Sequence, residues 1–389
     1  MKAGWKTVKL GEVARYDKVQ GIHSGLPYVG LEHIESGTRK FIGSRSDMEV
    51  QSSSFLFNPH HVLYGRLRPY LRKVLVPDFA GHCSTEIFPI LPSSDLDRSY
   101  LSYWLIAEFT TSAIDRLCNG ARMPRANMEQ ALELEIPLPP LAEQKRIVAL
   151  LDEAFAGIDE ATAKAEANIR DAEILFESYL QSVFHDQEQG WEQKRLGDLV
   201  TRLTNGYVGP TRNIYQESGV PYLLARHVKN NRLNFDGRTF ISQEFNLKNK
   251  KSLLKTGDVL LVQSGHIGHC AVVTDEHDGH NCHAMIVITA TKGSFIGPFL
   301  SLFFNSSGMK RKFEQIRSGS TVPHLTCGEI RELMIPLPTI EIQKDIVERA
   351  KVLDEYILQL RSNLANRLSA YDEFKRSLLI QAFAGELTA

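Results

Sequence analysis

One pattern of thirteen residues occurs twice in the sequence, as Ile136-Pro-Leu-Pro-Pro-Leu-Ala-Glu-Gln-Lys-Arg-Ile-Val148 and as Ile335-Pro-Leu-Pro-Thr-Ile-Glu-Ile-Gln-Lys-Asp-Ile-Val347. The two copies lie 199 residues apart in a chain of 389. Residues 178–184 (SYLQSVF) match residues 377–383 (SLLIQAF) at the same separation. Solenoid repeats have periods of about 20–50 residues, so each copy here is expected to contain a whole domain. The sequence therefore predicts an internal duplication.

The duplication extends to the start of each half. A tryptophan followed by Leu-Gly and an acidic residue opens both halves, at Trp5 and at Trp191. The separation is 186 residues at this point and 199 later, as expected when loops of different length interrupt a common fold. We predict four segments: a globular domain at 1–135, a long helix at 136–185, a second globular domain at 186–334 and a second long helix at 335–389.

The long helices are predicted from the spacing of apolar residues. Within residues 141–184 and 340–383 an apolar residue recurs about every 3.6 positions, which is the α-helical period. A helix of this length measures about 66 Å. An isolated helix would leave its apolar stripe uncovered, so we expect the two helices to pair with each other. The alternative is that each stripe packs only on its own domain.

The two globular blocks are predicted to be mixed α/β (α+β). Two aromatic-rich segments, Ser99–Leu117 and Ile296–Ile316, each predict one helix. Short apolar and β-branched runs bounded by turns predict strands at Val62–Tyr64, Ile87–Leu91, Asp258–Val262, Ala271–Val273 and Met285–Thr289.

The composition excludes several classes of protein. Apolar residues make up 43% and charged residues 23%, as in globular proteins, so the chain is neither fibrous nor disordered. The first twenty residues lack an apolar signal segment, and no run of eighteen apolar residues occurs. We therefore expect a soluble, cytoplasmic protein without membrane contact. The five cysteines are odd in number and far apart, which argues against a disulfide framework.

The charges nearly cancel over the whole chain. There are 45 Lys and Arg against 46 Asp and Glu, and a net charge of −1 is atypical of a nucleic-acid binder. Divided by segment, however, the balance is +1 for residues 1–135, −5 for 136–185, +4 for 186–335 and −1 for 336–389. The positive excess lies in the globular blocks and is modest, so we expect this chain alone to bind nucleic acid weakly.

The order of these features resembles one known family over essentially the whole chain. Two related α/β blocks, each followed by Pro-Leu-Pro, Gln-Lys-x-Ile-Val and a long helix, resemble the specificity subunit of type I restriction–modification systems. The turns at Gly120-x-x-x-Pro124 and Gly319-Ser-Thr-Val-Pro323 resemble the turn before the last strand of that family's domains. The first of these turns lacks the Ser-Thr pair.

The resemblance implies a fold and a function. Each globular block would be a target-recognition domain that reads one half of a split DNA target. The helices would form an antiparallel coiled coil that separates the domains. Double-stranded DNA, two methyltransferase (modification) subunits and restriction/translocase subunits are the implied partners. S-adenosylmethionine, ATP and Mg²⁺ would be bound by those subunits, and this chain would bind no cofactor and catalyse no reaction.

The motifs of catalysis agree with that implication. The sequence contains no G-x-x-x-x-G-K-[ST] phosphate loop, so ATP hydrolysis by this chain is not expected. Asn58-Pro-His-His61 begins like the Asn-Pro-Pro-aromatic motif of amino-methyltransferases. It lacks the second proline and the aromatic residue that stacks on a flipped base, so we interpret it as a turn.

The chief alternative is a metal-dependent nuclease or hydrolase. Zinc requires three or four N or S ligands. The spacing of the His and Cys residues in segment 266–283 matches no known zinc module. Ser264–Gly268 also resembles the glycine-rich turn of recognition domains. Seven potential ligands lie within residues 266–283: His266, His269, Cys270, His277, His280, Cys282 and His283.

The DNA-contacting residues are predicted from loops that carry cationic or amide side chains. Such side chains bind phosphates or base edges. Because the loops differ between the domains, with arginines in one and Gln, Ser and His in the other, the target should be bipartite and asymmetric. In the first domain the predicted residues are Arg66, Arg68, Arg72, Arg122 and Arg125. In the second they are Asn205, Tyr207, Arg212, Gln263, Ser264, His266, His269, Ser320, Thr321 and His324.

Overall fold

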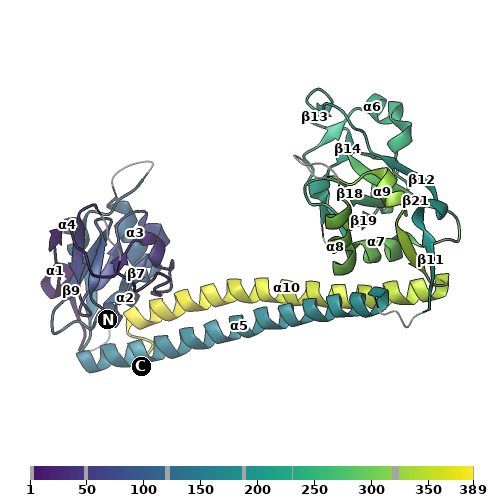
Figure 1. Cartoon of the computed structure of the whole chain (residues 1–389). Coiled ribbons are helices and arrows are strands. Elements are labelled where there is room, and N and C mark those ends of the chain that lie inside the picture. The colour runs from purple at the N-terminus through teal and green to yellow at the C-terminus, as the bar shows by residue number, and fades with distance from the viewer. Residues whose placement is uncertain are drawn as a thin grey trace. The chain divides into compact units, whose positions relative to one another are not determined.

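The structure is a computed structural model that describes residues 4–47, 51–118, 123–185, 190–229, 231–317 and 324–388. Its contacts divide the chain into two compact units. Unit 1 comprises residues 1–164 and 364–389, and unit 2 comprises residues 165–363. Each unit contains one mixed α/β domain and a segment of each long helix (Figure 1). No helix in the described residues is long and apolar enough to cross a membrane.

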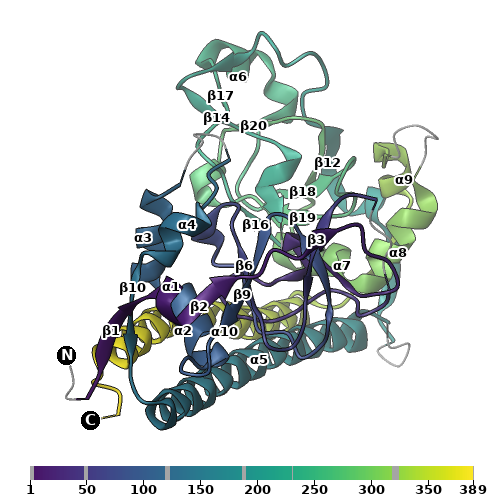
Figure 2. The same cartoon turned by 90° about the vertical axis from the view of Figure 1, so that its left-hand side faces the viewer.

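The domain of unit 1 is built on two four-stranded sheets and one strand pair. One sheet has the order β2-β9-β6-β7 and the other β3-β5-β8-β4. Strand β1 pairs with β10 (Figure 2). In chain order the elements are β1 (Lys6–Lys9), α1 (Leu10–Val13), β2 (Ala14–Tyr16), β3 (Gln20–Gly21), β4 (Tyr28–Val29), β5 (Ser54–Phe57), β6 (Val62–Gly65), β7 (Val74–Leu75), β8 (Gly81–Ser84), β9 (Ile87–Pro92), α2 (Arg98–Ile106), α3 (Glu108–Arg116), α4 (Met128–Leu132) and β10 (Glu135–Leu138).

The domain of unit 2 repeats this plan. Its sheet β12-β21-β18-β19 has the same order as β2-β9-β6-β7, and β11 pairs with β22 as β1 pairs with β10. The elements are β11 (Glu192–Arg195), β12 (Val200–Asn205), β13 (Tyr215–Gln216), β14 (Val220–Leu223), β15 (Val228–Lys229), β16 (Arg232–Leu233), β17 (Phe240–Ile241), α6 (Gln243–Lys248), β18 (Val259–Val262), β19 (Cys270–Val272), β20 (Asn281–Cys282), β21 (Met285–Ala290), α7 (Gly297–Asn305), α8 (Ser307–Ile316), α9 (Cys327–Arg331) and β22 (Met334–Leu337).

The central strands β6 and β18 explain how each domain is layered. Successive side chains of a strand point to opposite faces. In β18, Val259 and Leu261 belong to the core that the sheet shares with α7 and α8, and Leu260 and Val262 belong to the core on the other face. All four side chains are buried. The continuous apolar run therefore encodes a strand that is covered on both faces, and the predicted strands and mixed α/β class are confirmed.

The prediction of one helix over each aromatic-rich segment was wrong. Each segment forms two helices, α2 and α3 in unit 1 and α7 and α8 in unit 2. The breaks fall at Ala107 and Ser306, which have extended backbone angles (ψ 141° and 150°). The Ser306 hydroxyl accepts a hydrogen bond from the Met309 amide, so it caps the new helix α8. Apolar periodicity does not detect a turn of one residue.

The two long helices are confirmed almost to the residue. They are α5 (Leu141–His185) and α10 (Ile340–Ala384), and both units contain part of each (Figure 1, teal and yellow). In unit 1 the first part of α5 lies beside the last part of α10, with Lys375 Nζ 3.3 Å from Asp159 Oδ1. In unit 2 the last part of α5 lies beside the first part of α10, where the Tyr179 hydroxyl donates to the Ile346 carbonyl at 3.2 Å. The helices are therefore antiparallel within each unit.

The glutamine of the repeated pattern ties each helix to its domain. Gln144 is fully buried; its Oε1 accepts from the Asp97 amide at 2.8 Å, and its Nε2 donates to the Asp95 carbonyl at 2.9 Å. Gln343 makes the same contacts in unit 2, accepting from Ile296 at 2.9 Å. The glutamine of the repeated pattern thus connects each long helix by hydrogen bonds to the segment that precedes α2 or α7.

The predicted apolar stripes are covered only in part. Toward its ends each helix buries apolar residues in a domain core, such as Leu151 in unit 1 and Leu180 in unit 2. By contrast Leu150, Leu368 and Phe374, which the 3.6-residue period places on the stripes, are 38%, 42% and 50% exposed. The helices contact each other along some of their length. The alternative that each stripe packs only on its own domain is wrong, because Leu180 of α5 belongs to the core of the second domain and Phe383 of α10 to that of the first.

Candidate nucleic-acid interface

Two predicted loops meet in each domain, and they meet in the same way. In unit 1 the residue after Arg66 forms an antiparallel bridge with Arg125, and the Ala126 amide donates to the Arg66 carbonyl at 2.9 Å. In unit 2 Ser264 forms an antiparallel bridge with His324, and the amide that follows His324 donates to the Gln263 carbonyl at 2.9 Å. The loop after the central strand and the segment before α4 or α9 therefore form one surface in each domain.

A tight turn presents the arginines of unit 1. Arg68 and Arg72 adopt left-handed backbone angles (φ 52° and 49°) on either side of a 3₁₀ turn at Pro69–Leu71. Such angles are uncommon outside glycine and persist only where the surroundings hold them. The Arg68 amide donates to the Pro124 carbonyl at 2.8 Å, which fixes the turn against the second loop. Arg68 is exposed, and so is Tyr70, a residue that the sequence did not single out.

Glu86 lies beneath the arginines of this surface. Its carboxylate accepts from Arg125 Nε at 3.0 Å, and its carbonyl accepts from the Arg66 amide at 2.9 Å. The Arg66 guanidinium lies 5.0 Å from the ring centre of Phe88. One charge of the surface is therefore already neutralised by a carboxylate, while Arg66 is held by an aromatic ring.

Equivalent positions of the two domains carry opposite hydrogen-bonding groups. Arg66 and Gln263 occupy the same place in the repeated loop, directly after the central strand. Arg66 Nε, a donor, and Gln263 Oε1, an acceptor, are buried and have no hydrogen-bond partner in the described part of the chain. An unpaired buried polar atom costs about 1–3 kcal/mol. Each side chain therefore has one polar atom that the described part of the chain leaves unsatisfied.

In unit 2 a third predicted segment joins the surface. Asn205 ends β12, and its Oδ1 accepts from the thiol of Cys327 at 3.2 Å. Cys327 begins α9, three residues after His324. Burial raises the pKa of the Cys327 thiol, so the group stays protonated and serves as the donor. Asn205 therefore lies against the segment that contacts Ser264.

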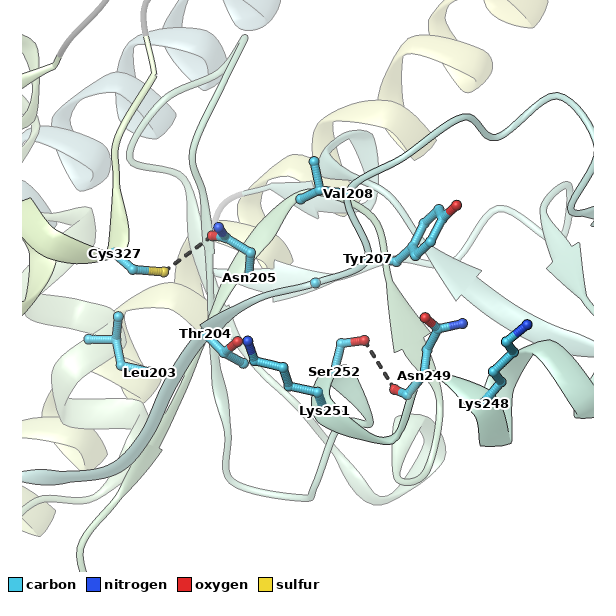
Figure 3. Close-up of a pocket in the computed structure, with 11 residues that line it drawn as sticks. Leu203, Thr204, Asn205, Tyr207, Val208, Lys248, Asn249, Lys251, Ser252 and Cys327 are labelled. Atoms are coloured by element: carbon cyan, nitrogen blue, oxygen red, sulfur yellow. Dashed lines mark hydrogen bonds between the residues drawn. The ribbon is translucent and has the colours of Figure 1, made fainter.

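Tyr207 continues from Asn205 and lines a pocket. The Tyr207 amide donates to the Cys282 carbonyl at 2.9 Å, and its ring packs edge-on against Phe245 at 5.0 Å. The pocket measures about 520 Å³ (Figure 3). It is lined by Leu203, Thr204, Asn205, Gly206, Tyr207, Val208, Lys248, Asn249, Lys251, Ser252 and Cys327. The lysines were not predicted, although their run at 248–255 was visible in the sequence.

The remaining predicted residues lie apart from the pocket or outside the described residues. His266 is exposed and His269 is half-buried, with ring centres 5.6 Å apart. Burial lowers the pKa of His269, and nearby Lys310 lowers it further. Arg212 is exposed on a loop between β12 and β13. Arg122, Ser320 and Thr321 fall outside the described residues.

The His/Cys cluster at 266–283 does not converge on a metal site among the described residues, so the alternative of a metal-dependent nuclease or hydrolase is not supported. Cys270 and Cys282 belong to different hydrophobic cores. Both thiols are fully buried, and burial raises the pKa of each to about 12. Among the described residues no group of three or more His, Cys, Asp or Glu side chains is placed to hold a metal ion.

Three histidines of unit 2 predict a dependence of stability on pH. Burial is the largest influence on His227, His280 and His283 and lowers the pKa of each below its ordinary value of 6.5. A lowered pKa means that folding favours the neutral ring. The stabilisation is therefore complete above pH 6.5 and is lost as the pH falls through the lowered pKa values. We expect the urea midpoint of unit 2 to be lower at pH 5.5 than at pH 7.5.

The His280→Asn variant serves as the control for this prediction. It removes one titrating group, so its midpoint should change less with pH than that of the parent chain. A midpoint that rises on acidification would contradict the assigned direction.

The comparisons with known proteins agree with this architecture. The chain consists of two similar α/β domains, each with a polar loop surface and a long helix. A family model described as "Type I restriction modification DNA specificity domain" matches residues 2–169 and 188–370. The two matches cover most of the chain, and the chain belongs to this family.

Individual relatives are distant. The EcoBI specificity subunit of Escherichia coli is 24% identical over 303 aligned positions, and the match covers 72% of this chain and 64% of that protein. The chain spans only 45% of the EcoDI specificity subunit, with 28% identity. The MjaVIII specificity subunit of Methanocaldococcus jannaschii is 22% identical, and the match covers 91% of this chain and 87% of that protein.

Two solved structures share the fold over the full chain. One is a chain from a type I restriction–modification system studied for its complex assembly, with a TM-score of 0.79, 21% identity and coverage of 100% of this chain and 99% of that chain. The other is the HsdS subunit from Thermoanaerobacter tengcongensis, with a TM-score of 0.63, 20% identity and coverage of 100% and 98%. At such identities the likeness concerns the fold.

Proposed function

We propose that this chain is the sequence-specific DNA-recognition subunit of a type I restriction–modification complex. The observation that carries the proposal is the pair of matched loop surfaces, one in each domain. The two surfaces share one backbone arrangement and differ in chemistry. Arg66 occupies the position that Gln263 has in the second domain, and Arg125 occupies the position of His324. Two loop surfaces of different chemistry on a duplicated fold suit a DNA target that is bipartite and asymmetric.

The proposed partners follow from the family and from the absence of catalytic motifs in the sequence. Methyltransferase subunits, two of them, and restriction/translocase subunits would assemble with this chain in the cytoplasm. They would bring S-adenosylmethionine, ATP and Mg²⁺, while this chain would be non-catalytic. Relatives named as specificity subunits support this division of labour.

Co-expression with a methyltransferase subunit tests the proposal. Sequencing of the modified adenines should show one split motif with two unlike halves and a fixed gap. The purified chain should also bind duplex DNA, with an affinity that falls steeply as salt increases. Absence of both methylation and salt-dependent binding would leave a scaffold without a DNA role and would refute the proposal.

A further inference from the structure

A cluster of positive charge lies beside the pocket of unit 2. Residues 248–255 read Lys-Asn-Lys-Lys-Ser-Leu-Leu-Lys, four lysines in eight residues. Among the described residues, no carboxylate lies within 4.0 Å of any of these ammonium groups. The pocket lining contains Lys248 and Lys251 and no acidic side chain. The pocket therefore presents uncompensated positive charge.

The lysines stand on a firmly held backbone. Arg202 Nη1 donates to the Leu253 carbonyl at 2.6 Å, and Asn281 Nδ2, which is fully buried, donates to the Asn249 carbonyl at 3.2 Å. The Ser252 hydroxyl also donates to Asn249, at 3.2 Å (Figure 3). Two hydrogen bonds from outside the segment and one within it fix its backbone, so only the lysine side chains lose freedom when they bind an anion.

The wall opposite the lysines belongs to the candidate DNA surface. Asn205 and Tyr207 line the same pocket, and Tyr207 packs on Phe245 of α6, the helix that ends at Lys248 (Figure 3). A group bound between the two walls would thus touch a cationic side and a side with amide and phenol groups. In DNA the corresponding arrangement is a backbone phosphate next to base edges.

The cationic wall has no counterpart in the first half of the sequence. The eight residues at the same distance before β6, residues 51–58 (QSSSFLFN), carry no charge. The lysines also account for much of the charge difference between the two domains, +1 for residues 1–135 against +4 for 186–335. The feature therefore distinguishes the second domain from the first.

We propose that the pocket formed by Lys248, Lys251 and the Asn205–Val208 segment binds a phosphate of the DNA backbone and anchors the second domain on DNA. The proposal rests on the proposed DNA-recognition function. The lysines act as point charges that neutralise phosphate and fix position, without reading sequence. The two domains therefore contribute unequally to DNA affinity, and the second domain supplies the larger electrostatic contribution.

The salt dependence of binding to a mixed-sequence duplex tests the proposal without knowledge of the target. Each lost phosphate contact reduces the magnitude of the negative slope of log affinity against log salt by about 0.9. Because the two lysines hold one phosphate, the full-length Lys248→Gln/Lys251→Gln variant should lose about 0.9 from the magnitude of the slope. Its loss of affinity between 50 and 200 mM salt should be about 3.5-fold smaller than that of the parent chain. Lys251→Arg, which keeps the charge, should retain the parent slope.

Matched controls separate the possible failures. Lys292→Gln removes one charge from an exposed turn of the same unit and should change the slope less than Lys251→Gln. An equal change would show a general charge effect and overturn the site. A parent-like salt slope in the Lys248→Gln/Lys251→Gln variant would also overturn the proposed site. If inorganic phosphate then raised the Tm of the parent chain but not that of the variant, the pocket would be a site for free phosphate. If the parent chain itself bound no duplex, the proposed function would fail instead.

Discussion

Replacing Gln263 with alanine is expected to relax one half of the methylated motif and to leave the other half unchanged. Gln263 stands directly after the central strand of unit 2, and its Oε1 has no partner in the described protein. Amide side chains read base edges through paired hydrogen bonds worth about 1–3 kcal/mol, or roughly 5–150-fold in discrimination. Comparing the methylation motifs of the parent and the variant in co-expressing cells measures the effect.

The equivalent variant of the first domain should give the complementary result. Arg66→Ala is expected to relax the other half-motif by a similar factor, because Arg66 holds the same place in the repeated loop. Gln193→Ala, which removes an exposed amide from β11, should leave both halves unchanged. If either loop variant altered both half-motifs, the assignment of one reader to each domain would fail.

Replacing Asp258 with alanine is expected to destabilise unit 2 by about 3–5 kcal/mol, as for other broken buried ion pairs. Asp258 is 1% exposed and pairs with Arg202, and its carboxylate also accepts from the Thr289 hydroxyl at 2.5 Å and the Lys255 amide at 2.8 Å. The variant would leave the Arg202 guanidinium partly buried without its counter-ion. Stabilities of whole domains are about 5–15 kcal/mol, so the loss is severe.

Urea unfolding followed by the fluorescence of Trp191, the tryptophan of unit 2, measures this loss. Asp198→Ala breaks the exposed ion pair with Arg195 and should leave the midpoint nearly unchanged. Equal effects of the two substitutions would show that burial does not govern the contribution of Asp258. Because Arg202 also holds the backbone beside Lys251, DNA binding by the Asp258→Ala variant is informative only if the domain remains folded.

The long-range plan of the molecule followed closely from the sequence. The helices at 141–184 and 340–383 were predicted to within one residue of α5 and α10, because a sustained 3.6-residue period after Pro-x-Pro leaves few alternatives. The buried strands β6 and β18 were equally clear from their apolar runs. The breaks at Ala107 and Ser306 were missed, because a single extended residue barely disturbs the apolar period of the flanking helices.

The candidate site was only partly visible from the sequence. The loops containing Arg66 and Gln263 were predicted from their residue types, but their bridges to Arg125 and His324 were not. The hydrogen bond from Cys327 to Asn205 spans 122 residues and left no local signal. The lysine run at 248–255 was present in the sequence, yet a run of charges is most often a solvated surface. Only the fold places two of these lysines in a pocket.

The sequence by itself determined that the chain is duplicated, that each half is a mixed α/β domain with a long helix, and that the positive excess of charge lies in the domains. These properties depend on periodicity, composition and self-similarity, which are local or repeat at a fixed separation. The tertiary structure decided which loops meet, that Cys270 and Cys282 are buried in separate cores rather than shared by a metal, and that a lysine wall faces Asn205 and Tyr207. Such contacts join residues distant in the chain, and they form only when the sheets and helices pack.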